Sequence, residues 1–409
     1  MKKAWISCIV LTVLLVVFLV PSANTQKKVR VVVGFEDENA LVEILNLPGA
    51  EKVKIIPEIK VMVLYLPEGI FNNFRRGKGL RYIENDGIAY TLEFSSSDIL
   101  WNVKMINTDK VWNTYFPQMG WSALGRGVVV AVLDTGVDYN HPELKSRLAW
   151  CAYTLGTRTY TGTNLKNCAD GNGHGTHVTG IIASAINGVG NAGVAPNVTI
   201  YVVKVLSNSG SGTYSDIAEG IILAVKGPDG IVGTSDDAKI LSMSLGGSSD
   251  NSVLRDAVSW AYSNGAVIVA AAGNSGDGNP STNNVAYPAK YSQVIAVAAV
   301  DSSGNVPSWS SDGVEVDVAA PGVNIYSTYK NSGYATASGT SMATPHVSAT
   351  IALIQALRLA QGKAPFTFNQ VYETLTRTTK DVSSPGFDVF SGYGLIDGLA
   401  AIEYALNQP

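Results

Sequence analysis

The chain has 409 residues, of which 46% are hydrophobic and 15% are charged, and its formal net charge is −4. This composition is too apolar for a disordered chain, and the charge balance gives no reason to expect a nucleic-acid partner. Three Cys and four His are too few for an array of zinc sites or a disulfide-rich miniprotein. We therefore expect a globular protein of two or three domains.

The N-terminus has the pattern of a secretory signal peptide. Lys2 and Lys3 precede an apolar run over residues 4–20, and small residues follow at 21–23. We assign residues 1–23 to a cleaved signal. An uncleaved anchor helix is the alternative, because the run has the minimum length for crossing a bilayer. No later stretch is long and apolar enough to do so, which predicts a secreted protein without stable membrane association.

Two cysteines remain once Cys8 leaves with the signal. Cys151 and Cys168 form an even pair in an oxidising compartment, where disulfides persist. We expect a disulfide between them, and two free thiols are the alternative. In the loop-entropy account such a crosslink stabilises the fold by roughly 3 kcal/mol.

The segment that follows the signal predicts a small domain of its own. Its pattern alternates as strand, helix, strand, strand, helix, strand, at residues 29–35, 39–47, 52–56, 60–66, 69–75 and 80–85. This βαββαβ order predicts a ferredoxin-like α+β domain with an antiparallel sheet. So short a domain is marginally stable alone.

From about residue 125 the pattern changes to a larger α/β domain. Continuous apolar strands are expected at 128–134, 199–206, 239–245, 266–272 and 293–299, and helices at 174–186, 214–225, 252–263 and 340–359. Unbroken apolar strands are buried on both faces, which predicts a doubly wound, mainly parallel sheet. In such a fold, functional residues gather at the carboxyl ends of the strands and the amino ends of the helices.

Three polar residues occupy such ends. Asp134 ends the first core strand in Asp-Thr-Gly, His174 opens a helix in Gly-His-Gly-Thr-His, and Ser341 opens another in Gly-Thr-Ser-Met-Ala. A serine hydroxyl is a weak nucleophile that needs a base, and the base needs a third group to fix its tautomer. Taken one at a time, Asp134 fits a turn, His174 fits a structural histidine, and Ser341 fits a helix cap. Together they predict an Asp-His-Ser catalytic triad.

The surrounding segments resemble a known family. VAVLDTGVD (130–138), GNGHGTHVTG (171–180) and GTSMATPHVSA (339–349) are similar to the three active-site signatures of the subtilases, the subtilisin-like serine endopeptidases. The resemblance covers roughly residues 97–400 and is closest in character to secreted, calcium-dependent subtilisins of heat-loving microbes. It implies a catalytic domain over 93–409 that hydrolyses peptide bonds of proteins, with no organic cofactor. We expect a monomer.

The resemblance extends to residues that bind the transition state and the substrate. Asn274, in AAAGNSG, matches the family's oxyanion asparagine, with a turn residue as the alternative. The implied substrate-binding residues are Ser244, Leu245 and Gly246 along a strand that pairs with the peptide, and Ala271, Ala272, Gly273 and Ala286 as walls of the first pocket. These walls are small, so we expect large apolar residues before the cleaved bond.

Residues 24–92 resemble the subtilase propeptide, mainly over Leu80–Tyr90. The resemblance implies a folding catalyst that also acts as an intramolecular inhibitor, which suits a slow-folding parallel sheet. Cleavage after Leu92 agrees with an apolar pocket, and Phe94 is the alternative. The segment could also be a permanent N-terminal domain.

Calcium ions are the implied cofactor. The loop at 185–191 is similar to the family's strong calcium loop, and Glu143 stands where the family often has Asp. The implied ligands are Ala185, Val189 and Asn191 through carbonyls, Asn187 through its side chain, Glu143, and Asp98 or a neighbour. A second, weaker site is expected at Ala289, Tyr291, Val294 and Asp317. The acidic loop at 228–237 is either a shortened calcium insertion or a solvated loop. The rival functional class is a non-catalytic binding or surface-assembly protein on this scaffold.

Overall fold

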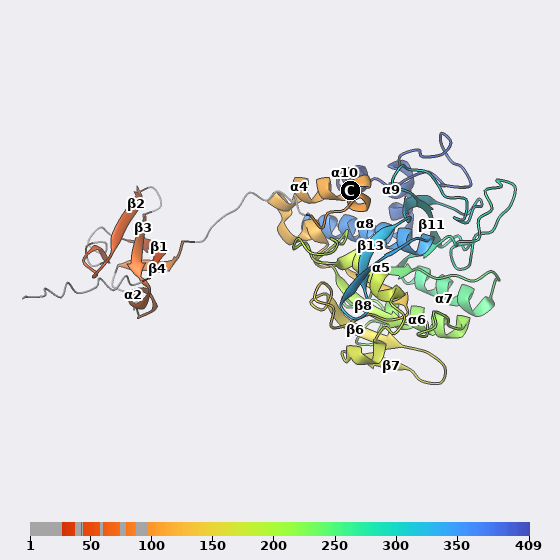
Figure 1. The fold of residues 1–409 in the computed structure, drawn as a ribbon, viewed down its shortest axis with the longest axis horizontal. Coiled ribbons are helices and arrows are strands. Elements are labelled where there is room, and N and C mark those ends of the chain that lie inside the picture. Colours follow the sequence, from red (N-terminus) through yellow and green to blue (C-terminus); the bar gives the residue numbers. More distant parts are fainter. Residues whose placement is uncertain (1–26, 37–41, 43, 58–59, 74–78, 87–96) are drawn as a thin grey trace, which may run out of the picture. The chain divides into compact units, whose positions relative to one another are not determined.

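The fold is described from a computed structural model that covers residues 27–36, 42, 44–57, 60–73, 79–86 and 97–409 (Figure 1). The chain divides into two compact units, one up to residue 91 and one from residue 92 onward. The expected signal peptide and the expected cleavage site at Leu92 lie outside the described residues. Within the described residues, no helix has the length and apolar character needed to cross a membrane.

The first unit is a four-stranded antiparallel sheet with the strand order β2-β3-β1-β4. Its elements are β1 (Lys28–Phe35), β2 (Glu51–Ile56), β3 (Val61–Pro67), α2 (Glu68–Asn73) and β4 (Leu80–Asn85). Apolar side chains that include Val31, Val33, Met62 and Leu64 form a core of its own. This strand order is the ferredoxin-like one that the βαββαβ pattern predicts. The helix expected at 39–47 lies partly outside the described residues.

The second unit is built on an eight-stranded sheet with the order β12-β11-β10-β9-β5-β8-β6-β7. Its strands are β5 (Val129–Asp134), β6 (Leu148–Tyr153), β7 (Tyr160–Gly162), β8 (Thr199–Lys204), β9 (Ile240–Met243), β10 (Val267–Ala271), β11 (Val294–Val300) and β12 (Val318–Pro321). Every neighbouring pair is parallel except β6 and β7. The predicted doubly wound, mainly parallel α/β fold is confirmed.

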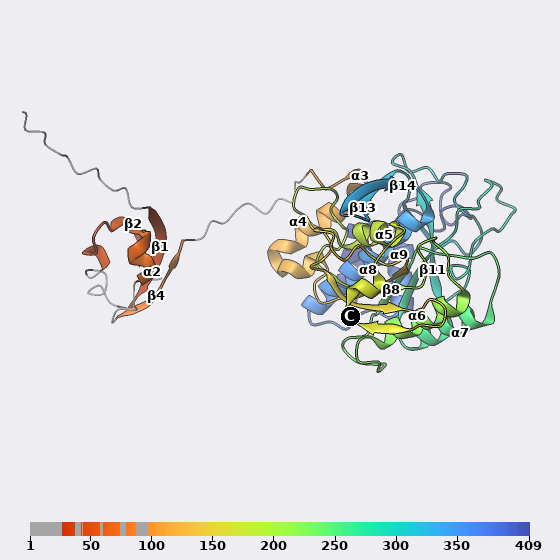
Figure 2. The ribbon, with the colours of Figure 1, turned by 60° about the horizontal axis from the view of Figure 1, so that its bottom comes forward.

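Helices cover both faces of this sheet, which is why strands such as β9, β10 and β11 are buried along their whole length (Figure 2). Helices α5 (His174–Ala183) and α8 (Thr340–Ala360) pack against each other, and α6 (Tyr214–Lys226) packs against α7 (Ser252–Ser263). The remaining helical segments are α3 (Trp101–Met105), α4 (Thr108–Met119), η2 (Gly120–Leu124), η3 (Leu165–Cys168), α9 (Phe368–Arg377) and α10 (Gly398–Asn407).

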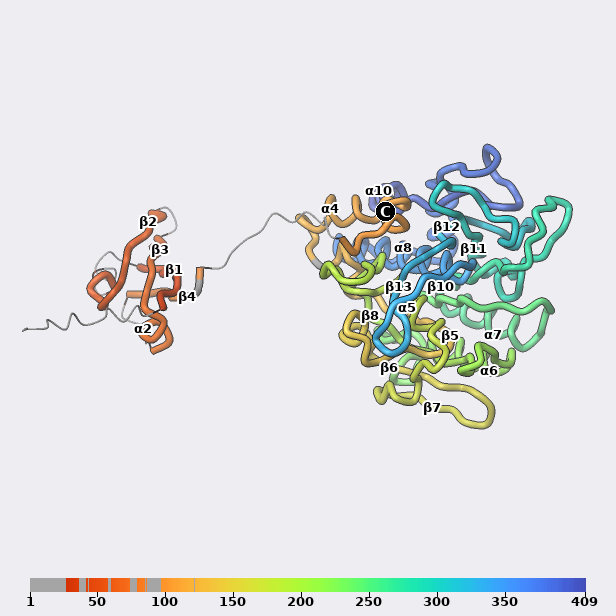
Figure 3. The backbone as a smooth tube through the Cα atoms, viewed as in Figure 1, coloured from red at the N-terminus to blue at the C-terminus, as the bar shows by residue number. Residues whose placement is uncertain are grey.

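A hairpin that the sequence pattern did not predict leads into α8. It consists of β13 (Ile325–Tyr329) and β14 (Gly333–Ala337), and the tube view shows it lying along α5 (Figure 3). Its Ser327 and Thr328 hydroxyls donate to the backbone carbonyls of His177 and Thr176, each at 2.8 Å. These contacts hold the chain just before α8 against the helix that His174 opens.

Candidate active site

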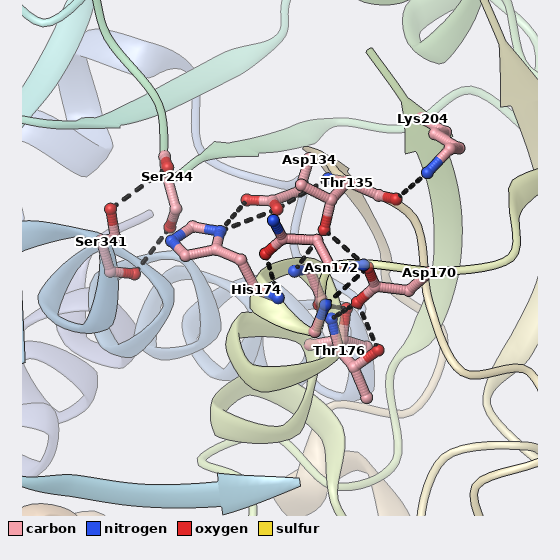
Figure 4. A network of polar contacts seen from close by, with 12 residues as sticks. Asp134, Thr135, Asp170, Asn172, His174, Thr176, Lys204, Ser244 and Ser341 are labelled. Atoms are coloured by element: carbon pink, nitrogen blue, oxygen red, sulfur yellow. Dashed lines mark hydrogen bonds and ion pairs between the residues drawn. The ribbon is translucent and has the colours of Figure 1, made fainter. Parts of the chain in front are cut away.

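The carboxyl end of β5 and the start of α5 bring Asp134 and His174 together. His174 Nδ1 lies 2.8 Å from Asp134 Oδ1 and 3.0 Å from Oδ2 (Figure 4). Asp134 is only 1% exposed, and its Oδ1 also accepts from the backbone N–H of Thr135 at 2.7 Å. The carboxylate therefore fixes the tautomer with the proton on Nδ1 and leaves Nε2 able to accept a proton.

Close packing of the two elements depends on glycine at Gly175. A Cβ at this position would lie 2.2 Å from the carbonyl oxygen of Gly136 and 3.1 Å from Asp134 Oδ1. No larger residue allows the first turn of α5 to approach the end of β5 so closely. The glycine after His174 is thus part of what positions the histidine.

Asp170, which sequence reasoning missed, anchors the start of α5. Its carboxylate accepts from the backbone N–H groups of Gly173 and Thr176 at 2.8 and 2.9 Å, and from the Thr176 and Thr135 hydroxyls at 2.6 and 2.9 Å. It therefore satisfies backbone donors that a helix start leaves without intrahelical partners. A signal existed in the sequence, since an Asp shortly before a helix is a typical capping residue.

A buried lysine at the end of β8 completes this network. Lys204 is 5% exposed, and its Nζ donates to the backbone carbonyl of Thr135 and to Asn208 Oδ1, the latter at 2.9 Å. Burial lowers the pKa of Lys204, and the negative charges of Asp170 and Asp134 act in the opposite direction. The lysine thus lies within the field of two buried carboxylates beneath the site.

The same charges act on the histidine. Burial opposes the charged form of His174, but the charge of Asp134, the hydrogen bond to it and the charge of Asp170 outweigh burial. The pKa of His174 is therefore raised above its ordinary value of 6.5. This makes the ring a stronger base than a free imidazole.

Ser341 lies in the first turn of α8, and its hydroxyl is directed to the end of β9. Ser341 Oγ donates to the Ser244 carbonyl oxygen at 3.2 Å, and Ser244 Oγ donates to the Ser341 carbonyl at 2.7 Å (Figure 4). Among the described residues, no hydrogen bond joins Ser341 to His174. In enzymes without substrate such contacts are often long and tighten only when substrate binds.

Asn274 lies in the loop after β10, next to the start of α8. Its Oδ1 accepts from the backbone N–H and the hydroxyl of Thr340 at 2.9 and 3.0 Å, which fixes the orientation of the amide. A Cβ on Gly339 would lie 3.5 Å from Asn274 Nδ2 and 3.7 Å from the Ser341 nitrogen. The Asn274 amide nitrogen and the Ser341 backbone nitrogen therefore both lie within 4 Å of the space beside Gly339.

The small residues expected to bind substrate line two cavities. One of about 430 Å³ contains Asn274, Ser341 and, of the expected residues, Leu245, Gly246, Ala271, Gly273 and Ala286. Gly273 has a φ of +116°, and a Cβ there would lie 2.7 Å from Ser311 Oγ. The second cavity, of about 600 Å³, contains His174, Ser244, Leu245 and Gly246, with Leu206, Tyr214 and Ile217 as apolar wall.

Two features of these cavities differ from the expectation. Ala272 lines neither of them: it is fully buried, because its backbone bonds to Val297 and Ala286 turn it into the core. The first cavity also includes Lys290, so its wall is not purely apolar. The Lys290 ammonium group donates to Asn283 Oδ1 at 2.8 Å.

Three of the residues expected to hold calcium, Asp98, Glu143 and Asn187, contact one another. Glu143 Oε2 accepts from Asn187 Nδ2, and Asp98 Oδ2 accepts from the backbone of Asn187, both at 2.9 Å. Asp98 Oδ1 and Asn191 Oδ1 are buried and have no hydrogen-bond partner. Buried oxygen atoms without donors fit a hard cation. Within the described part of the chain, no three His, Cys, Asp or Glu side chains form a metal cluster. The expected calcium set itself contains two carboxylates, those of Asp98 and Glu143.

The other expected cation sites differ from each other. Ala289, Tyr291, Val294 and Asp317 line a cavity of about 340 Å³, together with Glu315. Burial raises the pKa of Asp317 to about 6. In the loop at 228–237, Asp237 instead accepts from Lys239 and from the backbone of Gly233, each at 2.8 Å, so its charge is compensated by protein donors.

The cysteine pair differs from the expected disulfide. Cys151 and Cys168 are both buried, and both are free thiols in the structure. Each thiol donates to a backbone carbonyl, Cys151 to Asn164 at 3.6 Å and Cys168 to Ala152 at 3.1 Å, and the two side chains influence each other's pKa. The two side chains are therefore neighbours, as expected, but no bond joins them here.

Comparison with known proteins agrees with this geometry. The sequence profile of the subtilase family matches residues 125–394. Subtilisin DY from Bacillus licheniformis is 42% identical over 74% of this chain and 98% of the relative. Subtilisin E from Bacillus subtilis (strain 168) is 35% identical over 98% of this chain and 99% of the relative. Thermitase from Thermoactinomyces vulgaris is 40% identical over 70% of this chain and 93% of the relative. The chain belongs to the subtilase family and is a subtilisin-like serine endopeptidase.

Proposed function

We propose that Ser341 is the nucleophile, His174 the general base and acid, and Asp134 the residue that orients the base. Ser341 Oγ attacks the carbonyl carbon of the scissile peptide bond while His174 Nε2 takes its proton, and the ring then protonates the leaving amine. A water molecule then attacks the acyl-enzyme in the same way. His174 takes a proton from the water and returns a proton to Ser341 Oγ as the acyl group leaves. The observation that carries the proposal is the two-oxygen contact of Asp134 with His174 Nδ1.

Asn274 and the Ser341 backbone N–H are proposed to stabilise the oxyanion of the tetrahedral intermediate. Thr340 holds the Asn274 amide oxygen, so the amide nitrogen is left to donate. Donors fixed before the reaction need no reorganisation as negative charge develops on the substrate oxygen.

The substrate is proposed to be a protein segment that binds in extended form along Ser244–Gly246. Gly246, Ala271, Gly273 and Ala286 leave a cavity of about 430 Å³, large enough for a large apolar side chain before the cleaved bond. Lys290 also lines this cavity and is proposed to bind a polar group at the end of the substrate side chain.

The protein is further proposed to be secreted as a monomeric zymogen. Residues 1–23 would serve as the signal, and residues 24–92 as an intramolecular inhibitor that is removed after Leu92. The division of the structure near residue 91 supports a separable front unit. The match to subtilisin E over 98% of this chain supports the same layout.

Calcium is proposed to bind at Asp98, Glu143, Asn187 and Asn191, with the carbonyls of Ala185 and Val189. The unpartnered oxygens of Asp98 and Asn191 support this site, since a cation there would compensate their burial. A second, weaker site is proposed at Asp317 and the carbonyls of Ala289, Tyr291 and Val294. When bound, calcium would stabilise the fold and take no part in the chemistry. A disulfide between the neighbouring Cys151 and Cys168 is proposed for the secreted protein.

One experiment tests the catalytic proposal. The purified precursor and its Ser341→Ala variant are followed by intact-mass analysis while a peptide anilide with Phe before the leaving group reports hydrolysis. We expect the parent to lose the segment up to about residue 92 and then turn over substrate, and the variant to do neither. If both folded proteins stay intact and inactive across several peptides and pH values, the assignment fails and a non-catalytic binding protein is the remaining reading.

A further inference from the structure

A third cavity lies away from the active site, near the amino ends of β5 and β8. It has a volume of about 540 Å³ and is lined by residues 126–127, 146–149 and 197–199. We call it the Arg147 pocket. It shares no lining residue with the two cavities beside His174 and Ser341. Those cavities gather at the opposite, carboxyl ends of the strands.

The Arg147 pocket carries positive charge without a balancing carboxylate. Arg126 and Arg147 both line it, and no Asp or Glu does. Among the residues that the structure describes, neither arginine takes part in an ion pair. This is unusual in a chain whose net charge is −4. Two neighbouring guanidinium groups repel each other unless an anion lies between them.

Arg147 is held in place but is incompletely compensated. Its Nη1 donates to Asn197 Oδ1, while its Nε is buried and has no hydrogen-bond partner. Burial accordingly lowers the pKa of Arg147. Arg147 as a whole is half-buried, so its positive charge is only partly shielded from water, and one neutral protein acceptor contacts it.

The other polar groups of the pocket are donors as well. Because Asn197 Oδ1 accepts from Arg147, the Asn197 amide nitrogen is left to donate. Ser146 and Thr199, which carry hydroxyl groups, are also among the lining residues. The pocket therefore offers two guanidinium groups, one amide and two hydroxyls, more donors than one planar carboxylate can accept.

We propose that the Arg147 pocket is a binding site for a tetrahedral oxyanion, that is, a phosphate or sulfate group. The positive charges of Arg126 and Arg147 attract the oxygens of such a group, and the Asn197 amide nitrogen donates to one of them. The group could be a free ion or an ester on a polymer, and both share this chemistry. Because the pocket joins three segments far from Ser341, binding stabilises the fold and leaves peptide hydrolysis unchanged.

The test uses the full chain with Ser341→Ala, so that binding is measured without self-cleavage. Sodium sulfate is titrated from the micromolar to the low millimolar range at constant ionic strength, and the Tm is followed by intrinsic fluorescence. Dextran sulfate at a matched sulfate concentration forms a second arm. We expect a saturable rise in Tm with free sulfate. A rise only with dextran sulfate would assign the site to a polymer-borne group.

Matched variants separate this pocket from general salt effects. Arg147→Gln should abolish the saturable rise, and Arg147→Lys, which keeps the charge but loses the fork, should weaken binding about tenfold. Arg158→Gln removes an exposed arginine outside the pocket and should leave the titration unchanged. If Arg147→Gln does not fold, Arg126→Gln takes its place.

Two results would overturn the proposal. One is a Tm that does not saturate with either sulfate probe, and the other is an equal response in the parent and the Arg147 or Arg126 variants. Neither result bears on the catalytic proposal, because the measurement uses a protein without the Ser341 hydroxyl.

Discussion

The hydroxyl of Thr135 joins the two elements that carry Asp134 and His174. It donates to Asp170 Oδ1 at 2.9 Å and accepts from the backbone N–H of Gly175 at 2.9 Å. The residue after Asp134 is thus bonded to the residue after His174 and to the carboxylate that caps α5. The geometry of the Asp134–His174 pair depends on this buried network as much as on the pair itself.

Replacing Asp170 tests the importance of that network. Asp170→Ala removes the acceptor of the Gly173 and Thr176 donors. It also removes one of the negative charges that compensate the buried charge of Lys204. We expect a loss of about 3 kcal/mol or more in the free energy of unfolding. Urea denaturation of the Ser341→Ala protein measures it. The exposed Asp256→Ala control should change stability by less than about 0.5 kcal/mol, and a similarly small change at Asp170 would refute the role given to it.

The raised pKa of His174 predicts the pH dependence of hydrolysis. A protonated ring cannot accept the Ser341 proton, so kcat/KM falls as pH drops through the pKa of the free enzyme. Since that pKa is raised, we expect the acidic limb to have its midpoint above 6.5. Initial rates with a peptide anilide from pH 5 to 9 give the midpoint.

Asp134→Asn provides the comparison for that profile. It removes the charge that raises the pKa and disturbs the tautomer, so the limb should move to lower pH and kcat should fall about 10⁴-fold. A midpoint that stays unchanged in this variant would show that His174 is not the titrating group.

Asn274→Ala should lower kcat while leaving KM nearly the same. The Asn274 amide is proposed to donate only as the oxyanion forms, so its loss affects the transition state more than substrate binding. Removal of one such donor costs on the order of 10²- to 10³-fold in turnover in this family. Steady-state kinetics on the mature enzyme measure it, with Ser275→Ala as the neighbouring control. A change confined to KM would place Asn274 in substrate binding.

Removal of calcium should lower thermal stability. Without a cation the buried Asp98 and Asn191 oxygens have no partner, and the two carboxylates of the site are less well compensated. We expect the Tm of the Ser341→Ala protein to fall after dialysis against a chelator and to recover on addition of calcium. Differential scanning calorimetry gives the shift.

A single variant assigns that effect to the proposed site. Asp98→Ala should have a low Tm and lose most of its response to calcium, with only the smaller response of the second site left, while Asp256→Ala should respond as the parent does. An unchanged Tm after verified metal removal, or a full response in Asp98→Ala, would contradict the site.

Short-range patterns in the sequence were sufficient for the fold class, and they predicted the main site residues. The strands around Val130 and Ile268 are unbroken apolar runs, and burial on both faces of a sheet requires that composition locally. Asp134, His174 and Ser341 each occur in a glycine-flanked motif at a strand end or helix start, so each could be recognised within a few residues. The proposed calcium loop at 185–191 was likewise predicted from one contiguous segment.

Other features depend on contacts between residues far apart in the chain, and only the tertiary structure decided them. Lys204 lies beneath the site because β8 pairs with β5. Ala272 faces the core and not the cavity because its backbone bonds to β11. The donors of the Arg147 pocket meet because Asn197, 50 positions further along, accepts from Arg147. A local pattern specifies an element, but the order of strands in the sheet determines which elements become neighbours.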